Sequence, residues 1–272
     1  MLFRSKGTKY LPTYHASTPD TVWQHYGLTP EDAARGGMNA QMFNSFLDGT
    51  KSAIEMASVA NATALSAPQG LRFPPVGVDD LARVLRPASE GGILDVRGQV
   101  EVISSVERDA RPVFRDLRWG VYVPFAADSE YVARCFKEYG LITDPSGQYS
   151  SMYKPFHLIG LELGITVASI GVREESTGAP ICWNGDVVAT AKRDLAVGEI
   201  LDGEGGFTVY GKLLPASESI ALAGLPLGLA HGVKLVKPVK AGAAVGWNDV
   251  AFDAQSTAVK FRREMETLFG KK

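Results

Sequence analysis

Residues 39–65, NAQMFNSFLDGTKSAIEMASVANATAL, carry the pattern that decides the fold of the first half of the chain. At 100° per residue, their apolar side chains fall within one broad arc, which predicts one long helix packed on a core. The arc consists of Met42, Phe43, Phe46, Leu47, Ala53, Ile54, Ala57 and Ala60. Asn39, which follows two glycines and Met38, is the expected N-cap.

Away from the apolar arc, four polar residues share one line on this helix: Asn44, Asp48, Lys51 and Glu55. One interpretation is a solvated face with intrahelical ion pairs, which contribute little and carry no function. The other is a cluster that faces a pocket, because the remaining polar positions are small and neutral, unlike those of an exposed helix. In a cleft, Lys51 between carboxylates would donate a proton to an alkoxide or orient a carbonyl.

The composition is that of a globular protein. The 272 residues are 45% hydrophobic and 21% charged, enough for one large domain or two small ones. A net charge of −2 does not indicate a nucleic-acid partner. Its two cysteines match no disulfide or metal pattern, and no apolar run approaches the roughly 18 residues that span a bilayer. We therefore expect a cytoplasmic protein without a nucleic-acid or membrane partner.

Local signals predict further elements. Helix-start signatures, a hydroxyl cap followed by proline and acid, begin at Ser17 and Thr29. Residues 119–125 are typical of a strand, and residues 129–139 of an amphipathic helix. Pro155 is expected to open a helix that Gly164 closes, with a strand following over residues 165–172.

Four residues outside the helix predicted over residues 39–65 join Asn44 as candidate substrate ligands: His15, Arg118, Lys154 and His157. His15 precedes a predicted helix start, in a loop of the kind that lines sites. Arg118 belongs to a group of four arginines over residues 108–118, which is suited to a phosphate or carboxylate; a solvated hairpin connection is the alternative. Lys154 and His157 are three residues apart, and we expect them to face one site.

The chain changes character after residue 183. Residues 184–252 are rich in glycine and strand-like with short turns, and we interpret them as a small β module. Segments 187–202 and 235–250 form a weak internal repeat around a lysine and a glycine. A C-terminal helix is predicted over residues 257–269. The predicted fold class is α+β: a mixed α/β domain over residues 1–183, the β module over 184–252, and a C-terminal helix over 253–272.

Two parts of the chain resemble known families. The tail resembles a SAF domain, a β-clip module, through AKRDLAVGEILD (191–202), VKAG (239–242) and WNDV (247–250). The preceding region resembles the catalytic domain of the DRL oxidoreductases. The stretches that carry this resemblance are KYLP (9–12), STPDTVW (17–23), GMN (37–39), FNSFLDGTK (43–51), RDLRWGV (115–121) and KPFHLIGLE (154–162).

The DRL enzymes resemble homoserine dehydrogenase, and some act as a 1-deoxy-D-xylulose 5-phosphate reductoisomerase in isoprenoid precursor synthesis. The resemblance implies an NAD(P)H-dependent oxidoreductase that acts on a small carbonyl or hydroxy substrate, and we expect a homo-oligomer. Lys51 would donate a proton or polarise the carbonyl, while Asp48 and Glu55 would position Lys51 or hold a cation. Homoserine dehydrogenases place their acid and lysine four residues apart, whereas Asp48 and Lys51 are three apart. The roles therefore do not transfer position by position.

The nucleotide-binding half of these enzymes would carry G-x-G-x-x-G between a strand and a helix. The dense glycine group of this chain, GEGG at 203–206, instead precedes a predicted strand. We therefore expect the NAD or NADP site in a domain absent from this sequence. The sequence leaves open whether a divalent metal is also required. Two alternatives remain: a sugar-acid binding or assembly module without redox activity, and a SAF-containing lyase. The lyase would need a metal, to which Asp48 and Glu55 would offer two oxygen ligands.

Overall fold

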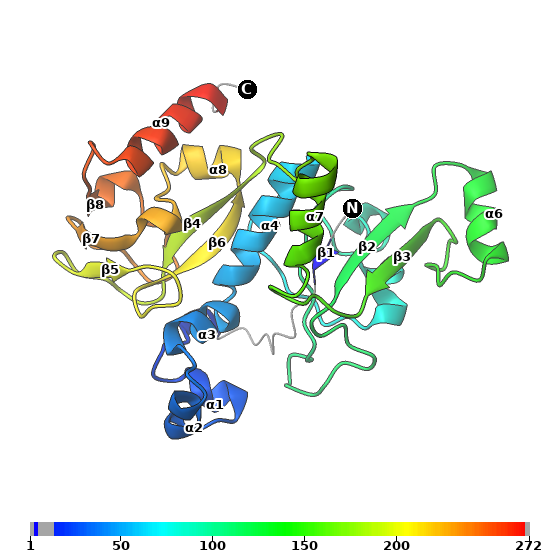
Figure 1. Cartoon of the computed structure of the whole chain (residues 1–272), viewed down its shortest axis with the longest axis horizontal. Helices are drawn as coiled ribbons and strands as arrows, with labels where there is room; N and C mark the ends of the chain where they lie inside the picture. Colours follow the sequence, from blue (N-terminus) through cyan, green and yellow to red (C-terminus); the bar gives the residue numbers. More distant parts are fainter. Residues whose placement is uncertain (1–2, 5–13, 270–272) are drawn as a thin grey trace. The chain divides into compact units, whose positions relative to one another are not determined.

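The computed structural model describes residues 3–4 and 14–269 and shows the predicted α+β fold class (Figure 1). The helices are α1 (Val22–Tyr26), α2 (Pro30–Arg35), α3 (Ala40–Leu47), α4 (Thr50–Thr63), α5 (Leu81–Val84), α6 (Glu130–Glu138), α7 (Leu163–Arg173), α8 (Ala216–Ala221) and α9 (Thr257–Phe269). The strands are β1 (Phe3–Arg4), β2 (Val121–Ala126), β3 (Tyr149–Lys154), β4 (Gly185–Ala191), β5 (Ile200–Asp202), β6 (Val209–Pro215), β7 (His231–Leu235) and β8 (Val250–Ala251).

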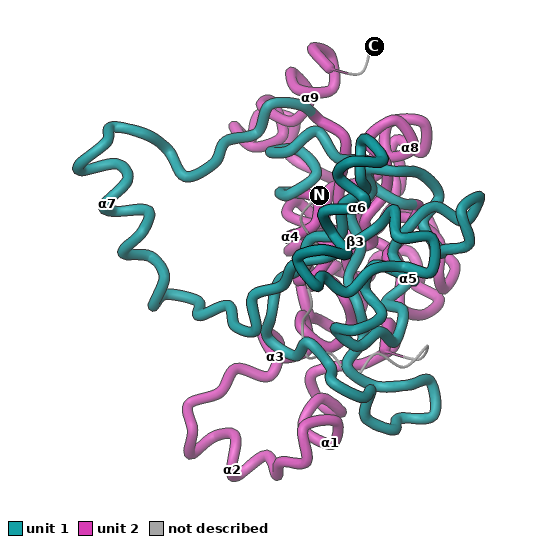
Figure 2. Tube along the Cα trace, turned by 90° about the vertical axis from the view of Figure 1, so that its right-hand side faces the viewer, with its two compact units in different colours: residues 1–10, 58–68, 72–182 teal, residues 11–57, 69–71, 183–272 magenta. Residues whose placement is uncertain are grey.

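The chain forms two compact units that do not follow the order of the sequence (Figure 2). Unit 1 comprises residues 1–10, 58–68 and 72–182, and unit 2 comprises residues 11–57, 69–71 and 183–272. The boundary crosses α4, whose first turns belong to unit 2 and whose last turns belong to unit 1. The segment that carries Asp48 and Lys51 therefore folds with the C-terminal β module.

The prediction of one long helix over residues 39–65 is wrong, because α3 ends at Leu47 and α4 begins at Thr50. Gly49, between them, adopts a φ of 87°, a left-handed conformation that glycine reaches without strain. The Asp-Gly dipeptide is a turn signal, but the apolar periodicity continues on both sides of it and predicted an unbroken helix. The break also removes the single line of four polar residues. Asn39 is the predicted N-cap, since its side chain accepts from the Met42 amide at 2.9 Å.

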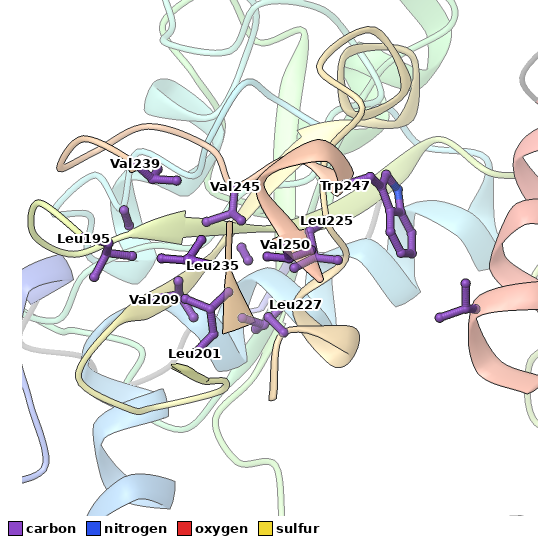
Figure 3. Packing of buried hydrophobic residues seen from close by; sticks show 14 residues of the cluster. Leu195, Leu201, Val209, Leu225, Leu227, Leu235, Val239, Val245, Trp247 and Val250 are labelled. Carbon is purple, nitrogen blue, oxygen red and sulfur yellow. The ribbon is translucent and has the colours of Figure 1, made fainter. Parts of the chain in front are cut away.

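Unit 2 is built around the β module. Strands β4 and β6 pair antiparallel, and β5, β7 and β8 form a second antiparallel sheet. Their inward-facing side chains form one core, against which Ile54 of α4 packs. Figure 3 shows this core: Leu195, Leu201, Val209, Leu225, Leu227, Leu235, Val239, Val245, Trp247 and Val250 are labelled there. This shared core attaches α4 to the β module.

The two halves of the internal repeat pair with each other within unit 2. Leu195 and Val239 exchange two backbone hydrogen bonds, of 2.8 and 3.0 Å, and Thr190 faces Ala244 in an antiparallel bridge. The C-terminal helix is confirmed as α9. Its Arg262 binds the Asp186 carboxylate with two nitrogens, at 2.5 and 3.0 Å, and so fixes α9 to β4.

Unit 1 contains the antiparallel sheet β1-β2-β3 and a separate apolar core. Strand β2 confirms the strand expected over 119–125, and α6 confirms the amphipathic helix, with Ser129 as its N-cap. The helix expected from Pro155 and the strand expected over 165–172 are both wrong, because residues 163–173 form α7. The β-branched residues of α7 favoured a strand in the sequence, but they lower helix propensity only slightly.

Candidate functional site

Asp48 lies at the junction of α3 and α4 and is completely buried. Its Oδ1 accepts a hydrogen bond from the Thr50 amide at 3.0 Å, at the start of α4. Its Oδ2 lies 2.7 Å from Nζ of Lys192, the residue directly after β4. Burial raises the pKa of the Asp48 carboxyl, while the Lys192 ammonium and the Thr50 hydrogen bonds oppose this effect. Asp48 and Lys192 thus form a buried ion pair between the helices and the β module.

The Lys192 ammonium is saturated by the protein. Besides Asp48, it donates to the carbonyl oxygens of Ser17 and Gly206, at 2.8 Å each, and its side chain is 2% exposed. An ammonium has three protons, and each has an acceptor here. Lys192 therefore ties three chain segments together. Sequence reasoning missed it, although Lys192 directly follows the strand-like segment VVATA (187–191).

Asn44, a predicted substrate ligand, is also buried within this framework. Its Oδ1 accepts from the Ser17 hydroxyl at 2.7 Å, and its Nδ2 donates to the Ser17 and Gly205 carbonyls, at 3.1 and 2.8 Å. These bonds engage both ends of the amide with the protein itself. The structure therefore places Asn44 as a connector between α3 and the turn at 203–206.

The glycine-rich turn at 203–206 does not fit a dinucleotide. A Cβ on Gly205 would lie 2.0 Å from the carbonyl oxygen of Gln41, so the backbone of α3 packs directly against the backbone of this turn. Gln41 Nε2 donates to the carbonyls of Asp202 and Glu204, at 3.1 and 2.8 Å, and Ser45 donates to the Glu204 carboxylate at 2.5 Å. Because α3 fills the space that a pyrophosphate would need, the turn serves packing.

His15 lies against the same junction. Its Nδ1 is 3.1 Å from the carbonyl oxygen of Asp48, and its ring stacks on Tyr210 of β6 with centroids 4.4 Å apart. Since a carbonyl only accepts, Nδ1 carries the proton of the neutral ring and Nε2 is the basic nitrogen. The pKa of His15 is lowered, mainly by burial and further by Lys212 and Lys192, with the Asp48 carbonyl opposing. His15 is therefore held as a neutral imidazole of defined tautomer.

Lys51 stands in the first turn of α4 and is half-buried. Over the described residues it forms no ion pair, so the intrahelical pairs of the solvated-face interpretation are not formed and Asp48 is held by Lys192 instead. Glu55 is half-buried one turn further along α4. The catalytic roles expected of Lys51 and Glu55 stay predictions.

The other three predicted ligands belong to unit 1, whereas His15 and Lys51 belong to unit 2. Lys154 and His157 come together on Glu162: Lys154 forms an ion pair with it, and His157 Nδ1 lies 3.4 Å from its Oε2. Arg118 is exposed and lies 3.6 Å from Asp116. The four arginines do not converge, because the other three bind separate partners. Those partners are the Arg72 and Phe73 carbonyls for Arg108, Asp109 for Arg111, and Asp79 for Arg115.

The described part of the chain contains no ready metal site. No group of three or more His, Cys, Asp or Glu side chains there is placed to hold a metal ion. Asp48, one of the two expected oxygen ligands, is engaged by Lys192. Over residues 3–4 and 14–269, no helix combines the length and apolar character needed to cross a membrane.

Comparison with protein families assigns both parts of the chain. Residues 1–163 match the catalytic domain of the oxidoreductase DRL, and residues 186–251 match the SAF domain. The chain belongs to the DRL oxidoreductase family. The DRL match contains His15, Asp48 and Lys51, and the SAF match contains Lys192 and Tyr210, so the buried ion pair joins the two matched regions. No curated protein matches the chain.

Proposed function

We propose that this chain supplies the substrate-binding and proton-transfer part of an NAD(P)H-dependent oxidoreductase that acts on a small carbonyl or hydroxy compound. The observation that carries the proposal is the placement of His15 and Lys51 around the start of α4, beside the saturated pair of Asp48 and Lys192. Because the charges of Asp48 and Lys192 neutralise each other, this pair does not bind the substrate and instead holds the surrounding segments in place. His15 and Lys51 are then the groups of this junction that meet the substrate.

Lys51 acts on the substrate oxygen in this proposal. Its ammonium and the N-terminal end of α4 are both positive, and both favour an oxygen that gains negative charge. Lys51 therefore polarises the carbonyl or donates a proton to the alkoxide. No step is assigned to the nicotinamide itself, since the glycine-rich turn at 203–206 does not fit it.

His15 supplies the base. The Asp48 carbonyl holds the proton on Nδ1, so Nε2 takes a proton from a substrate hydroxyl or returns one to it. Stacking on Tyr210 restricts the ring plane and hence the direction of Nε2. Homoserine oxidation and the reductoisomerase reaction of 1-deoxy-D-xylulose 5-phosphate are the two finer candidates, because each is compatible with one lysine near a carbonyl.

The test is turnover by a complete enzyme, in which a nucleotide-binding domain accompanies this chain, with NADPH and 1-deoxy-D-xylulose 5-phosphate, and with NAD(P)+ and L-homoserine, followed by nicotinamide absorbance. Lys51→Ala should lower kcat by about 100-fold or more, the usual contribution of acid–base catalysis. His15→Asn keeps a donor for the Asp48 carbonyl but removes Nε2, and should abolish the acidic limb of the pH–rate profile. Lys260→Ala, at an exposed position of α9, is the matched control. A fully active Lys51→Ala variant would contradict the proposal.

A further inference from the structure

Strand β6 brings a second lysine to the face that carries His15. Tyr210 and Lys212 are two residues apart in β6, and such residues project from the same face of a strand. Tyr210 stacks on His15, so Lys212 stands one strand repeat, about 7 Å, beyond it. The amide of Gly211, between them, donates to the Thr50 hydroxyl at 2.8 Å and fixes β6 against the start of α4.

That hydrogen bond makes Thr50 and Gly211 neighbours, and Lys51 and Lys212 are the residues that directly follow them in the chain. Both lysines are half-buried, and within the described part of the chain neither has a carboxylate within ion-pair distance. A Cβ on Gly70 would lie 3.1 Å from Cε of Lys212, so the lysine reaches the loop at residues 69–71. The position of Lys212 is therefore defined at both ends of its side chain.

Within the described part of the chain, the charged side chains that act on His15 are the two lysines Lys192 and Lys212. Lys192 is neutralised by Asp48, but Lys212 adds a positive charge that helps to lower the pKa of His15. The Glu204 carboxylate is bound by Ser45, and the Asp48 carboxylate faces Lys192 rather than Lys212. A half-buried ammonium without a counter-charge is costly, and an anion bound beside it would remove that cost.

We propose that Lys212 binds a small oxyanion group of the substrate, a phosphate or a carboxylate, next to His15. The β module would then supply a residue that determines specificity to a site on α4, in addition to its packing role. As a substrate subsite this rests on the proposed function. The binding of the anion itself needs no turnover and can be tested alone.

The experiment follows His15 by NMR, using the ring Cε1–H signals of the four histidines of the whole chain. The His15 signal is the one absent from the His15→Asn variant. Each protein is titrated with pH at constant ionic strength in chloride, inorganic phosphate or acetate. In the wild type, a bound anion should raise the pKa of His15 by about half a pH unit or more, with a saturable dependence on anion concentration. A response to phosphate indicates a phosphoryl group, and a response to acetate indicates a carboxylate.

Lys212→Gln should raise the pKa of His15 in chloride and abolish the response to either anion. Lys212→Arg keeps the charge, should keep the response, and serves as the second variant if the glutamine protein does not fold. Lys237→Gln removes a charge from the exposed loop after β7 and should respond like the wild type. The proposal is overturned if neither anion moves His15 in the wild type, or if Lys212→Gln keeps the full response. A Lys51→Ala enzyme with normal turnover would end the proposed function but leave this binding result intact.

Discussion

Two fully buried carboxyl groups, Asp48 in unit 2 and Glu101 in unit 1, differ in what compensates their burial. Asp48 faces the Lys192 ammonium at 2.7 Å. Glu101 accepts backbone hydrogen bonds from Val102 and Arg72, at 2.9 and 3.0 Å, and over the described residues it has no ion-pair partner. Burial raises the pKa of Glu101 to about 7, against the backbone amides and the more distant Arg72 charge.

The comparison separates two ways of keeping a buried acid. A backbone cradle is local, and with a pKa of about 7 it leaves Glu101 about half protonated at pH 7. An ammonium must be brought from elsewhere, so the pair also connects distant parts of the chain. Asp48 has this second role, since its carboxylate holds the β module while its carbonyl holds His15.

The largest expected effect is on Lys192. Lys192→Met leaves the Asp48 carboxylate buried without a cation and removes the donor to the Ser17 and Gly206 carbonyls. The free energy of unfolding should fall by about 3–5 kcal/mol, as for other broken buried pairs. Urea denaturation at pH 7 measures it, with Lys237→Met as the exposed control. An unchanged midpoint for Lys192→Met would mean that Asp48 does not need the ammonium.

Glu101 should show a smaller effect with a definite pH dependence. Its pKa is about 7 in the folded chain against an ordinary value of 4.5, so between these values the folded state binds more protons. Its contribution to stability is therefore present below pH 4.5 and is lost as the pH rises through 7. Glu101→Gln keeps the acceptor and cannot ionise, so it should be more stable than the wild type at pH 8, by at most about 3 kcal/mol.

Urea denaturation from pH 4.5 to 8 checks the Glu101 prediction as a difference between variant and wild type. Glu138→Gln, at the exposed end of α6, is the control and should run parallel to the wild type. A Glu101→Gln curve that is equally parallel would show that Glu101 is ionised in the fold at no cost.

The smallest expected effect on stability is at Lys51. Its side chain is half-buried on α4 without an ion pair over the described residues, and alanine is the best helix former. Lys51→Ala should change the free energy of unfolding by less than about 0.5 kcal/mol, in contrast to Lys192→Met. Thermal unfolding of the two variants side by side makes the comparison. A large loss for Lys51→Ala would assign Lys51 to the framework instead of the site.

The features that the sequence predicted correctly depend on neighbouring residues. The caps at Asn39 and Thr29 each involve a bond three residues away, so their spacing is visible in the chain. The break at Gly49 was missed because apolar periodicity extends across it. Helix α7 was missed because its β-branched residues are typical of a strand, although 11 residues exceed the usual length of a strand.

The candidate site residues also divide into those that local sequence identified and those that depend on distant partners. His15 was selected for its place before a helix start, and Lys51 for its place among carboxylates, and the structure puts both around the start of α4. The roles of Asn44 and Asp48 as connectors depend on the turn at 203–206 and on Lys192, which stand far along the chain. No local spacing links such partners, so tertiary structure was needed to find them.

The most direct test of the central claim is a double-mutant cycle on the buried pair, using urea denaturation of Asp48→Asn, Lys192→Met and the double variant at pH 7. If the pair joins the central helices to the β module as an ion pair, the double variant should recover much of the stability lost in Lys192→Met. The coupling energy should then be about 2–3 kcal/mol. If the two single effects add to within about 0.5 kcal/mol, the residues act independently and the account of this junction is contradicted.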